Sequence, residues 1–303
     1  MKKLLCVDGN SILNRAFYGV KPLTTRDGRN TNAIFGFIQM LYKQITDLSP
    51  DYAAIAFDLK APTFRHKKCD YYKATRHGMP AELAEQMPIA KEVARMMGFH
   101  VLTMEGFEAD DILGTLSTLS NDSLQVYIMT GDRDSYQLIT KTTSVLYVST
   151  KDTSVFDEAA FAAAYGGTTP IRLIDIKALM GDTSDNIPGV AGVGEKTAVN
   201  LIASFGSLDG VYKALDEGDP AIKGALIGKL TAGREKAYES RFLAEICKSV
   251  PLGVSADDLV YGGINKAELL AVCRDLELNR IIERLNLDVP DESAPEPMEK
   301  QTA

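Results

Sequence analysis

The sequence has few residues of the kinds that bind zinc or form disulfides. Its 303 residues include three histidines and four cysteines, and Cys6, Cys69, Cys247 and Cys273 stand far apart in the chain. This spacing is not that of a zinc knuckle or of a redox pair, so neither kind of site is expected. Isolated cysteines are typical of reduced thiols in a cytosolic protein.

The sequence also lacks any long apolar run. No stretch approaches the roughly 20 apolar residues that a membrane span needs. Asp8 interrupts the short apolar run at the N-terminus too early for the core of a signal peptide. We therefore expect a cytoplasmic protein without a membrane partner, and nothing in the sequence indicates more than a monomer.

Positive charge is scarce over the whole chain but concentrated in one segment. The 33 Lys and Arg residues face 41 Asp and Glu, a net charge of −8, which argues against a broadly basic nucleic-acid binder. Residues 60–77, KAPTFRHKKCDYYKATRH, nevertheless carry eight Lys, Arg and His residues against the single acid Asp70, with two tyrosines interleaved. Cations among aromatics suit a phosphate backbone and stacked bases, although a solvated helix face has the same pattern.

Strand-like and helix-like patterns alternate in the first half of the chain. Apolar runs at residues 2–8, 51–58, 99–104, 124–132 and 144–150 predict strands, and residues 32–45 and 81–98 have helical periodicity. This alternation predicts an α/β domain over residues 1–170 with a mostly parallel sheet. Residues 171–287 predict a second, helical domain with glycine-rich turns, and the Pro- and acid-rich residues 288–303 predict a disordered tail or linker.

Carboxylates follow the predicted strands. Three strands end at Asp8, at Asp58 and at Asp132 with Asp134, and sites in open α/β sheets form outside the carboxyl ends of the strands. The segment GFEADDILGTL follows another strand through a short loop, and MGDTSDN adds a further pair. Nine carboxylates are therefore expected at one edge: Asp8, Asp58, Glu108, Asp110, Asp111, Asp132, Asp134, Asp182 and Asp185.

A divalent-metal site explains the whole set of acids better than a separate capping role for each acid does. Any one of these acids could cap a helix or a turn. Clustered like charges, however, raise one another's pKa and destabilise a site, and a divalent cation removes that cost. All-oxygen ligands suit Mg²⁺ or Mn²⁺, and two metals about 3.5–4 Å apart would serve in-line displacement at phosphorus.

A glycine-rich hairpin follows the last acidic pair. In NIPGVAGVGEKTAVNLIASFG, residues 186–206, Gly192 and Gly194 flank a tight turn and a helix is expected from about Glu195. Glycines allow close approach to a phosphate, and the amides of a helix N-terminus bind anions. The pattern predicts a helix-hairpin-helix that binds a DNA backbone independently of sequence.

Together these motifs resemble the 5′-nuclease domain of bacterial DNA polymerase I, in the flap-endonuclease family with its PIN-like core. The resemblance is carried, in order, by VDGNSILNRAFYG, FDLKAPTFRH, GFEADDILGTL, TGDRDSYQL, ALMGDTSDNIPGVAGVGEKTA and FGSL, and it spans Lys2 to about Leu287. It implies a twisted, mostly parallel sheet flanked by helices. It also implies a helical arch at about residues 62–80 and a helix-three-turn-helix at residues 183–206.

The resemblance also assigns roles to residues. The tighter of two Mg²⁺ sites would take Asp8, Asp58, Glu108, Asp110 and Asp111, and the second would take Asp132, Asp134, Asp182 and Asp185. Lys73 and Arg76 would be the catalytic basic pair of the arch. DNA contacts would include Arg15, Arg65, Tyr72, Lys73, Arg76, Gly189, Gly192, Gly194, Lys196 and Thr197. The hairpin would offer backbone carbonyls to a K⁺ ion.

The implied activity is that of a structure-specific 5′-3′ exonuclease and flap endonuclease. Its partner would be duplex DNA of the nucleoid with a 5′ end, nick or flap, including RNA-primed DNA, and its products a 5′-phosphate and a 3′-hydroxyl. Two alternatives remain: a non-catalytic module that binds DNA structures, and a PIN-type ribonuclease. All nine carboxylates are kept, which predicts activity.

Two departures from the family pattern stand out. The arch ends in RHGMP, where an RPPMP-like turn is expected, so the local geometry of the arch is an open question. No polymerase domain follows in the sequence, whose last residue is Ala303. The chain is therefore expected to be either a stand-alone relative or a fragment that works with a polymerase.

Overall fold

A six-stranded sheet forms the centre of the computed structural model, which describes residues 1–76, 78–149 and 152–288. The strand order is β3-β2-β1-β4-β5-β6. The strands are β1 (Lys2–Asp8), β2 (Tyr52–Ala56), β3 (His100–Leu102), β4 (Leu124–Thr130), β5 (Thr143–Val148) and β6 (Thr153–Phe156). The first five are parallel and β6 is antiparallel to β5. The predicted mostly parallel sheet is confirmed, and β6 is a strand that the sequence analysis did not anticipate.

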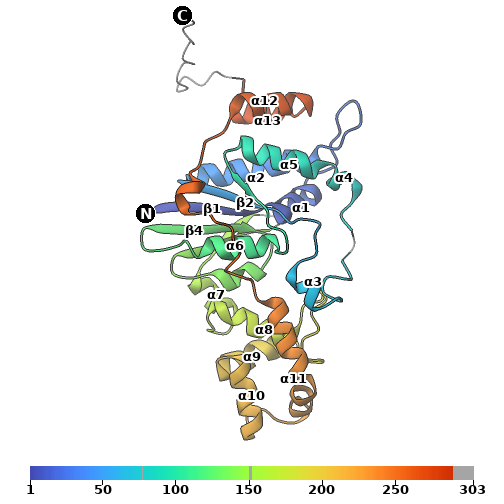
Figure 1. Cartoon of the computed structure of the whole chain (residues 1–303), viewed down its shortest axis with the longest axis vertical. Coiled ribbons are helices and arrows are strands. Elements are labelled where there is room, and N and C mark those ends of the chain that lie inside the picture. The colour runs from blue at the N-terminus through green and yellow to red at the C-terminus, as the bar shows by residue number, and fades with distance from the viewer. Residues whose placement is uncertain (77, 150–151, 289–303) are drawn as a thin grey trace, which may run out of the picture.

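The central strands are buried on both faces, which explains their continuous apolar runs. Along β1, Leu5 and Val7 pack with α1 (Gly9–Gly19), α2 (Asn32–Leu48) and α5 (Gln86–Met96) on one face. Leu4 and Cys6 point to the other face, which α6 (Ala109–Ser117) covers. Figure 1 shows α2 and α5 above the sheet and α6 and α7 (Glu158–Ala164) below it. The core therefore has two layers separated by the sheet.

A helical unit lies beyond the α6 face of the sheet. It contains α8 (Leu173–Met180), α9 (Glu195–Phe205), α10 (Leu208–Glu217) and α11 (Ala225–Ala244), at the bottom of Figure 1. Short 3₁₀ turns lie at Asp134–Leu138, Pro170–Arg172 and Ala256–Leu259. The unit shares its buried side chains with the underside of the sheet, so it holds α9 and its preceding loop close to the strand ends.

The last two helices belong to the opposite end of the molecule. After α11 the chain runs back past the sheet, where the Tyr261 amide donates to the carbonyl of Asp51 at 2.9 Å. α12 (Lys266–Asp275) and α13 (Asn279–Leu285) then pack against α2 and α5, at the top of Figure 1. The expectation of one helical domain over residues 171–287 therefore needs correction, because the apolar side chains of residues 266–287 complete the core of the α/β unit.

The expected arch contains less helix than the resemblance implies. α3 covers only Phe64–Lys68 and α4 only Ala81–Ala84, and His77 lies outside the described residues. Between them the chain forms turns and lies against the loop after α8. There the Lys73 amide donates to the Asp185 carbonyl at 2.9 Å, and Asn186 Nδ2 donates to the Tyr71 carbonyl at 2.7 Å. In the described ranges no helix is long and apolar enough to cross a membrane.

Candidate functional site

Three neighbouring strands bring three of the predicted acids to one edge of the sheet. β2, β1 and β4 lie side by side, and Asp8 pairs in register with Ala56, two residues before Asp58. Asp8 caps α1 by accepting the Ser11 amide at 2.9 Å, and its other oxygen accepts the Thr130 hydroxyl at 2.8 Å. Parallel strands thus fix these carboxylates by backbone geometry.

Helix α6 brings further acids to the same edge. Glu108 is its N-cap residue, Asp110 lies in its first turn, and the Ala109 amide donates to Asp58 at 2.7 Å. Asp110 Oδ1 is buried without a hydrogen-bond partner among the described residues. A buried carboxylate oxygen without a hydrogen-bond partner destabilises the fold, so a ligand is expected at this atom.

The acids of this edge act electrostatically on one another. Burial, with Asp58 and Asp132 nearby, raises the pKa of Asp8 to about 7. Burial, with Asp8 and Asp132 nearby, raises the pKa of Asp110 well above its usual value. A divalent cation reverses both effects, because it favours the charged form of each carboxylate. The available donors are hard carboxylate oxygens, and one of them, Asp110 Oδ1, has no partner among the described residues. Such a set of donors fits Mg²⁺ or Mn²⁺.

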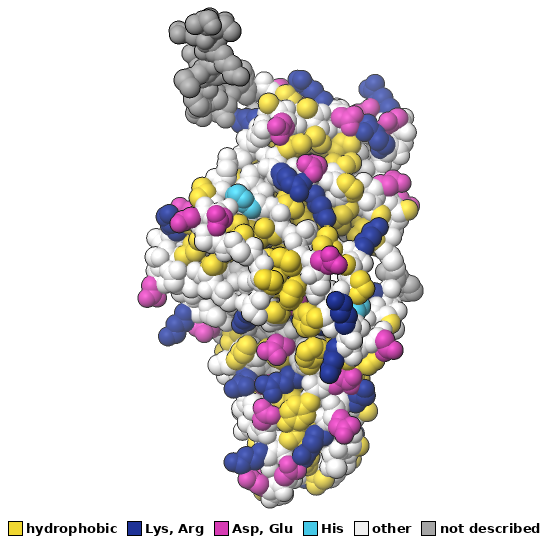
Figure 2. All heavy atoms as spheres, in the orientation of Figure 1, with side chains coloured by type: hydrophobic (Ala, Val, Ile, Leu, Met, Phe, Trp, Pro, Cys, Tyr) yellow, Lys and Arg dark blue, Asp and Glu magenta, His cyan; other side chains and the backbone are white. Residues whose placement is uncertain are grey.

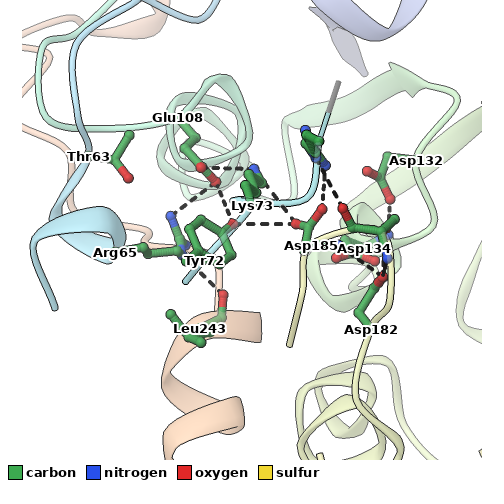
Figure 3. A network of polar contacts seen from close by, with 12 residues as sticks. Thr63, Arg65, Tyr72, Lys73, Glu108, Asp132, Asp134, Asp182, Asp185 and Leu243 are labelled. Carbon is green, nitrogen blue, oxygen red and sulfur yellow. Dashed lines mark hydrogen bonds and ion pairs between the residues drawn. The ribbon is translucent and has the colours of Figure 1, made fainter. Parts of the chain in front are cut away.

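Lysine side chains lie between the acids. Figure 3 shows Lys73 between Glu108 and Asp185, and Lys177 pairs with Asp134 and Asp182. Within the described ranges no three His, Cys, Asp or Glu side chains form a ready metal-binding group. Lys73 Nζ lies 2.8 Å from Glu108 Oε1 and 3.7 Å from Asp185 Oδ2. Each lysine therefore neutralises a pair of carboxylates that would otherwise repel.

Lys177 performs this role for the second pair and was missed from the sequence. Its ammonium pairs with Asp134 and, at 2.5 Å, with Asp182. Against the opposing effect of burial, Lys177 and Ser184 hold the pKa of Asp182 down at about 2. Burial and Asp132 raise the pKa of Asp134 to about 7 despite its lysine partner. The signal was a lysine in the mostly apolar helix α8, LIDIKALM, where it is buried.

Arg65 and Asp111 form a buried pair, which bears on the roles expected of both residues. Their side chains are 2% and 0% exposed. The guanidinium binds the carboxylate through two parallel hydrogen bonds of 2.8 Å, a geometry typical of strong Arg–carboxylate pairs. In this structure Arg65 therefore has no surface to offer DNA.

The remaining groups of this pair are also satisfied. Arg65 Nε donates to the Leu243 carbonyl at 3.1 Å and Nη2 to the Glu245 carbonyl at 2.5 Å. The two oxygens of Asp111 additionally accept the amides of Cys247 at 2.8 Å and Glu108 at 3.0 Å. With both oxygens used, Asp111 fixes the start of α6 and ties α3 to the end of α11, and it could bind a metal only by giving up some of these contacts.

The basic segment faces the carboxylates. Tyr72 is buried, and its hydroxyl lies 3.1 Å from Glu108 Oε2 and 3.4 Å from Asp185 Oδ2, so it does not present a stacking surface here. The side chain of Arg76 is 48% exposed and pairs with Asp185. Lys73 and Arg76 thus place positive charge directly over the acidic edge. The face drawn in Figure 2 carries no comparable patch, because positive and negative side chains are interspersed on it.

The loop between α8 and α9 contains the predicted hairpin glycines. Gly189 has φ +61°, and a Cβ there would lie 2.3 Å from the Gly181 nitrogen, so Gly189 serves close packing inside the loop. Gly192, Gly194 and Lys196 are exposed. Thr197 is half-buried one residue further along α9, so exposed amides and a cation meet at the start of this helix.

Arg15 lies on the other side of the acidic edge, on α1. With Ser11, Asn14 and Tyr18 it lines a shallow cavity of about 240 Å³, and its Nη2 lies 3.5 Å from the Gly131 carbonyl. Candidate phosphate-binding groups therefore flank the carboxylates on two sides: Arg15 on α1 and the hairpin before α9.

Two family models match most of the chain. The one described as 5′-3′ exonuclease, N-terminal resolvase-like domain, matches residues 3–166, and the one described as 5′-3′ exonuclease, C-terminal SAM fold, matches residues 168–267. DNA polymerase I of Caldicellulosiruptor bescii is 40% identical over 94% of this chain and 34% of its own length. DNA polymerase I of Bacillus subtilis is 40% identical over 95% of this chain and 32% of its own length. The chain thus spans about a third of the length of these curated relatives.

Solved structures share the fold at lower identity. A flap endonuclease of bacteriophage T5, in a complex with DNA and metal ions, superposes with a TM-score of 0.67 at 20% identity, over 94% of this chain and 99% of that one. The catalytic core of Rad2 in complex with DNA substrate gives a TM-score of 0.60 at 17% identity, over 94% and 92% of the two chains.

Proposed function

The chain belongs to the 5′-3′ exonuclease family, and from this premise we propose that it is a divalent-metal-dependent, structure-specific 5′ nuclease acting on DNA. One observation carries the proposal. The ends of three adjacent parallel strands and the start of α6 gather mutually repelling, buried carboxylates at one edge, and Asp110 Oδ1 there is buried without a partner. Bound divalent cations would relieve this repulsion and ligate the free oxygen.

The proposed metal ligands exclude Asp111 and fall into two groups. One Mg²⁺ would be held by Asp8, Asp58, Glu108 and Asp110, and a second by Asp132, Asp134, Asp182 and Asp185. When bound, these ions supply an activated water and neutralise charge on the reacting phosphate. The ammonium of Lys73 and that of Lys177 must leave the carboxylates they now neutralise when the cations bind.

The chain's own residues would position the DNA. Lys73 and Arg76 lie over the acidic edge, where they would bind the scissile phosphate and stabilise charge that develops on it. The hairpin before α9 and Arg15 on α1 flank this edge, which suits a duplex that passes across it. We propose substrates with a 5′ end, nick or flap, including RNA-primed DNA, and products with a 5′-phosphate and a 3′-hydroxyl. We further propose that the nuclease works with a DNA polymerase, because its relatives are DNA polymerase I chains.

Cleavage of a 5′-labelled flap duplex tests the proposal. We expect release of the flap with Mg²⁺, none with EDTA, and none from Asp132→Ala, which should still bind the duplex. Asp122→Ala is the matched control, since Asp122 is an exposed acid just before β4, at the other end of the strand that leads to Asp132. Binding without cleavage under every divalent metal would refute the nuclease and favour a binding module. Preferred cleavage of single-stranded RNA would favour a ribonuclease.

A further inference from the structure

A second site lies next to the acidic edge, in a cavity of about 350 Å³ between the loop after β4 and the start of α9. Its lining includes four aromatic rings and two side chains of opposite charge: Tyr136, Tyr147, Phe156, Tyr165, Arg133 and Glu195. These residues come from five separate elements or loops. Arg133 stands between Asp132 and Asp134, and Glu195 directly follows the hairpin residue Gly194. The cavity therefore joins the acidic edge to the hairpin.

The aromatic walls are rigid. Tyr136 and Phe156 stack with their centroids 4.4 Å apart and their planes 13° apart, and Tyr147 meets them edge-on at 5.8 and 6.5 Å. Tyr165 is buried and stacks on Phe161 at 4.4 Å. Tyr136 and Tyr165 are buried, but Tyr147 and Phe156 are only partly buried, so these two rings offer the cavity a fixed aromatic surface of the kind on which nucleobases stack.

Arg133 is the cation of this cavity and has no acidic partner. Its guanidinium lies 5.7 Å from the centroid of the Tyr147 ring, and no ion pair joins it to a carboxylate within the described ranges, although acids precede and follow it in the chain. Lys73, Arg76 and Lys177, by contrast, are all paired with carboxylates. Arg133 is exposed and hydrogen-bonds Tyr147, which leaves further guanidinium donors for a phosphate.

Glu195 gives the cavity a second polar end. Arg133, Tyr165 and Glu195 all line this cavity, and both charged groups act electrostatically on the Tyr165 hydroxyl. Burial raises the pKa of Tyr165 and of Tyr136, and their hydroxyls remain donors at neutral pH. The cavity thus offers a site for an anion, flat apolar walls, and an acceptor for amino or imino groups.

We propose that this cavity is a nucleotide subsite, in which Arg133 binds the phosphate, Tyr147 and Phe156 stack the base, and Glu195 accepts from the base edge. The identity of the ligand rests on the proposed function, because a DNA nuclease provides nucleotides from two sources. One is an unpaired nucleotide of the bound strand, and the other is a released mononucleotide.

Ligand-detected NMR with 2′-deoxyguanosine 5′-monophosphate tests the site directly, in EDTA so that cleavage plays no part. We expect saturable binding, with stronger saturation transfer to the base than to the sugar, and binding about tenfold weaker in Arg133→Gln because one charge-assisted contact is lost. Glu195→Gln should weaken guanine binding and leave 2-deoxyribose 5-phosphate binding unchanged. Arg280→Gln, an exposed arginine on α13, is the matched control.

Three results would overturn the proposal: no saturable binding to the wild type, equal binding by Arg133→Gln and Arg280→Gln, or equal affinity for the nucleotide and the sugar phosphate.

Competition with DNA then identifies the source of the bound nucleotide. Displacement only by a nicked duplex with one unpaired nucleotide assigns the cavity to the substrate strand, and displacement by neither that duplex nor a fully paired one assigns it to the released product. Equal displacement by both would show a general duplex surface and refute a nucleotide subsite. Flap cleavage by the wild type, measured in parallel, tests the proposed function separately, because nucleotide binding in EDTA does not require cleavage.

Discussion

Replacing Asp111 and its neighbour Asp110 by asparagine should have opposite consequences. The two acids are adjacent in α6, and sequence alone assigns both to metal. In the structure Asp111 is fully buried and bonded to Arg65 through two contacts of 2.8 Å, whereas Asp110 Oδ1 has no partner among the described residues. The Asp111 carboxylate therefore stabilises the fold, whereas the Asp110 carboxyl group, buried close to other acids, destabilises it.

The magnitude follows from the burial of the pair. Removing one partner of a buried ion pair leaves the other charge uncompensated and costs roughly 3–5 kcal/mol. With a melting shift of about 2–4 °C per kcal/mol for a domain of this size, Asp111→Asn should lower the melting temperature by roughly 6–20 °C. Asp110→Asn removes a buried carboxyl group whose pKa is raised by burial and by its acidic neighbours, so it should melt no lower than the wild type.

Thermal unfolding in EDTA, followed by flap cleavage below the lower melting temperature, separates the two roles. We expect Asp111→Asn to cleave with Mg²⁺ while folded, and Asp110→Asn to be inactive although stable. The double variant Arg65→Met/Asp111→Leu should recover part of the lost stability, because an apolar pair can replace a buried ion pair. An Asp111→Asn protein that melts like the wild type but does not cleave would refute the assignment and return Asp111 to the metal ligands.

Three further predictions concern pH, backbone and charge. In EDTA the Asp8 carboxyl group should lower the stability by about 3 kcal/mol between pH 4 and pH 7: folding raises its pKa from 3.8 to about 7, so over this range the folded protein binds the extra proton. Urea unfolding should show stability falling as the pH rises, and Asp8→Asn should make this fall smaller without abolishing it, because the pKa values of Asp110 and Asp134 are raised too. Gly189→Ala should destabilise by at least 1–3 kcal/mol, because its φ is +61° and a Cβ would strike backbone, whereas Gly194→Ala, with open space around it, should melt like the wild type. Lys177→Met should destabilise the metal-free protein by about 3 kcal/mol, and Mg²⁺ should restore the loss; a metal-independent loss would contradict the role of Lys177 as counter-ion.

The sheet and its acidic edge could be predicted because both leave local signals. Apolar runs of strand length mark β1, β2 and β4, and an acid follows each run, so parallel pairing alone brings Asp8, Asp58 and Asp132 together. The partner of each charged side chain could not be predicted, because the two residues of each pair are far apart in the sequence. Arg65 meets Asp111 over 46 residues and Lys177 meets Asp134 over 43. A charged residue has the same appearance in a sequence whether it is solvated, bound to DNA or buried in a pair.

The acid–base pairings of Arg65, Lys73 and Lys177 at the edge differ in how readily they can be exchanged for metal. Arg65 is buried, keeps its charge at any working pH, and uses donors on all three of its nitrogens, so its pairing with Asp111 is permanent. Lys73 and Lys177 are flexible ammonium groups held mainly by the carboxylates themselves. A divalent cation carries twice the charge of an ammonium and can displace it, and a displaced Lys73 then becomes free to bind a phosphate. The same lysine would thus stabilise the metal-free fold and contribute to the loaded site, which couples the assembly of the active centre to the arrival of metal.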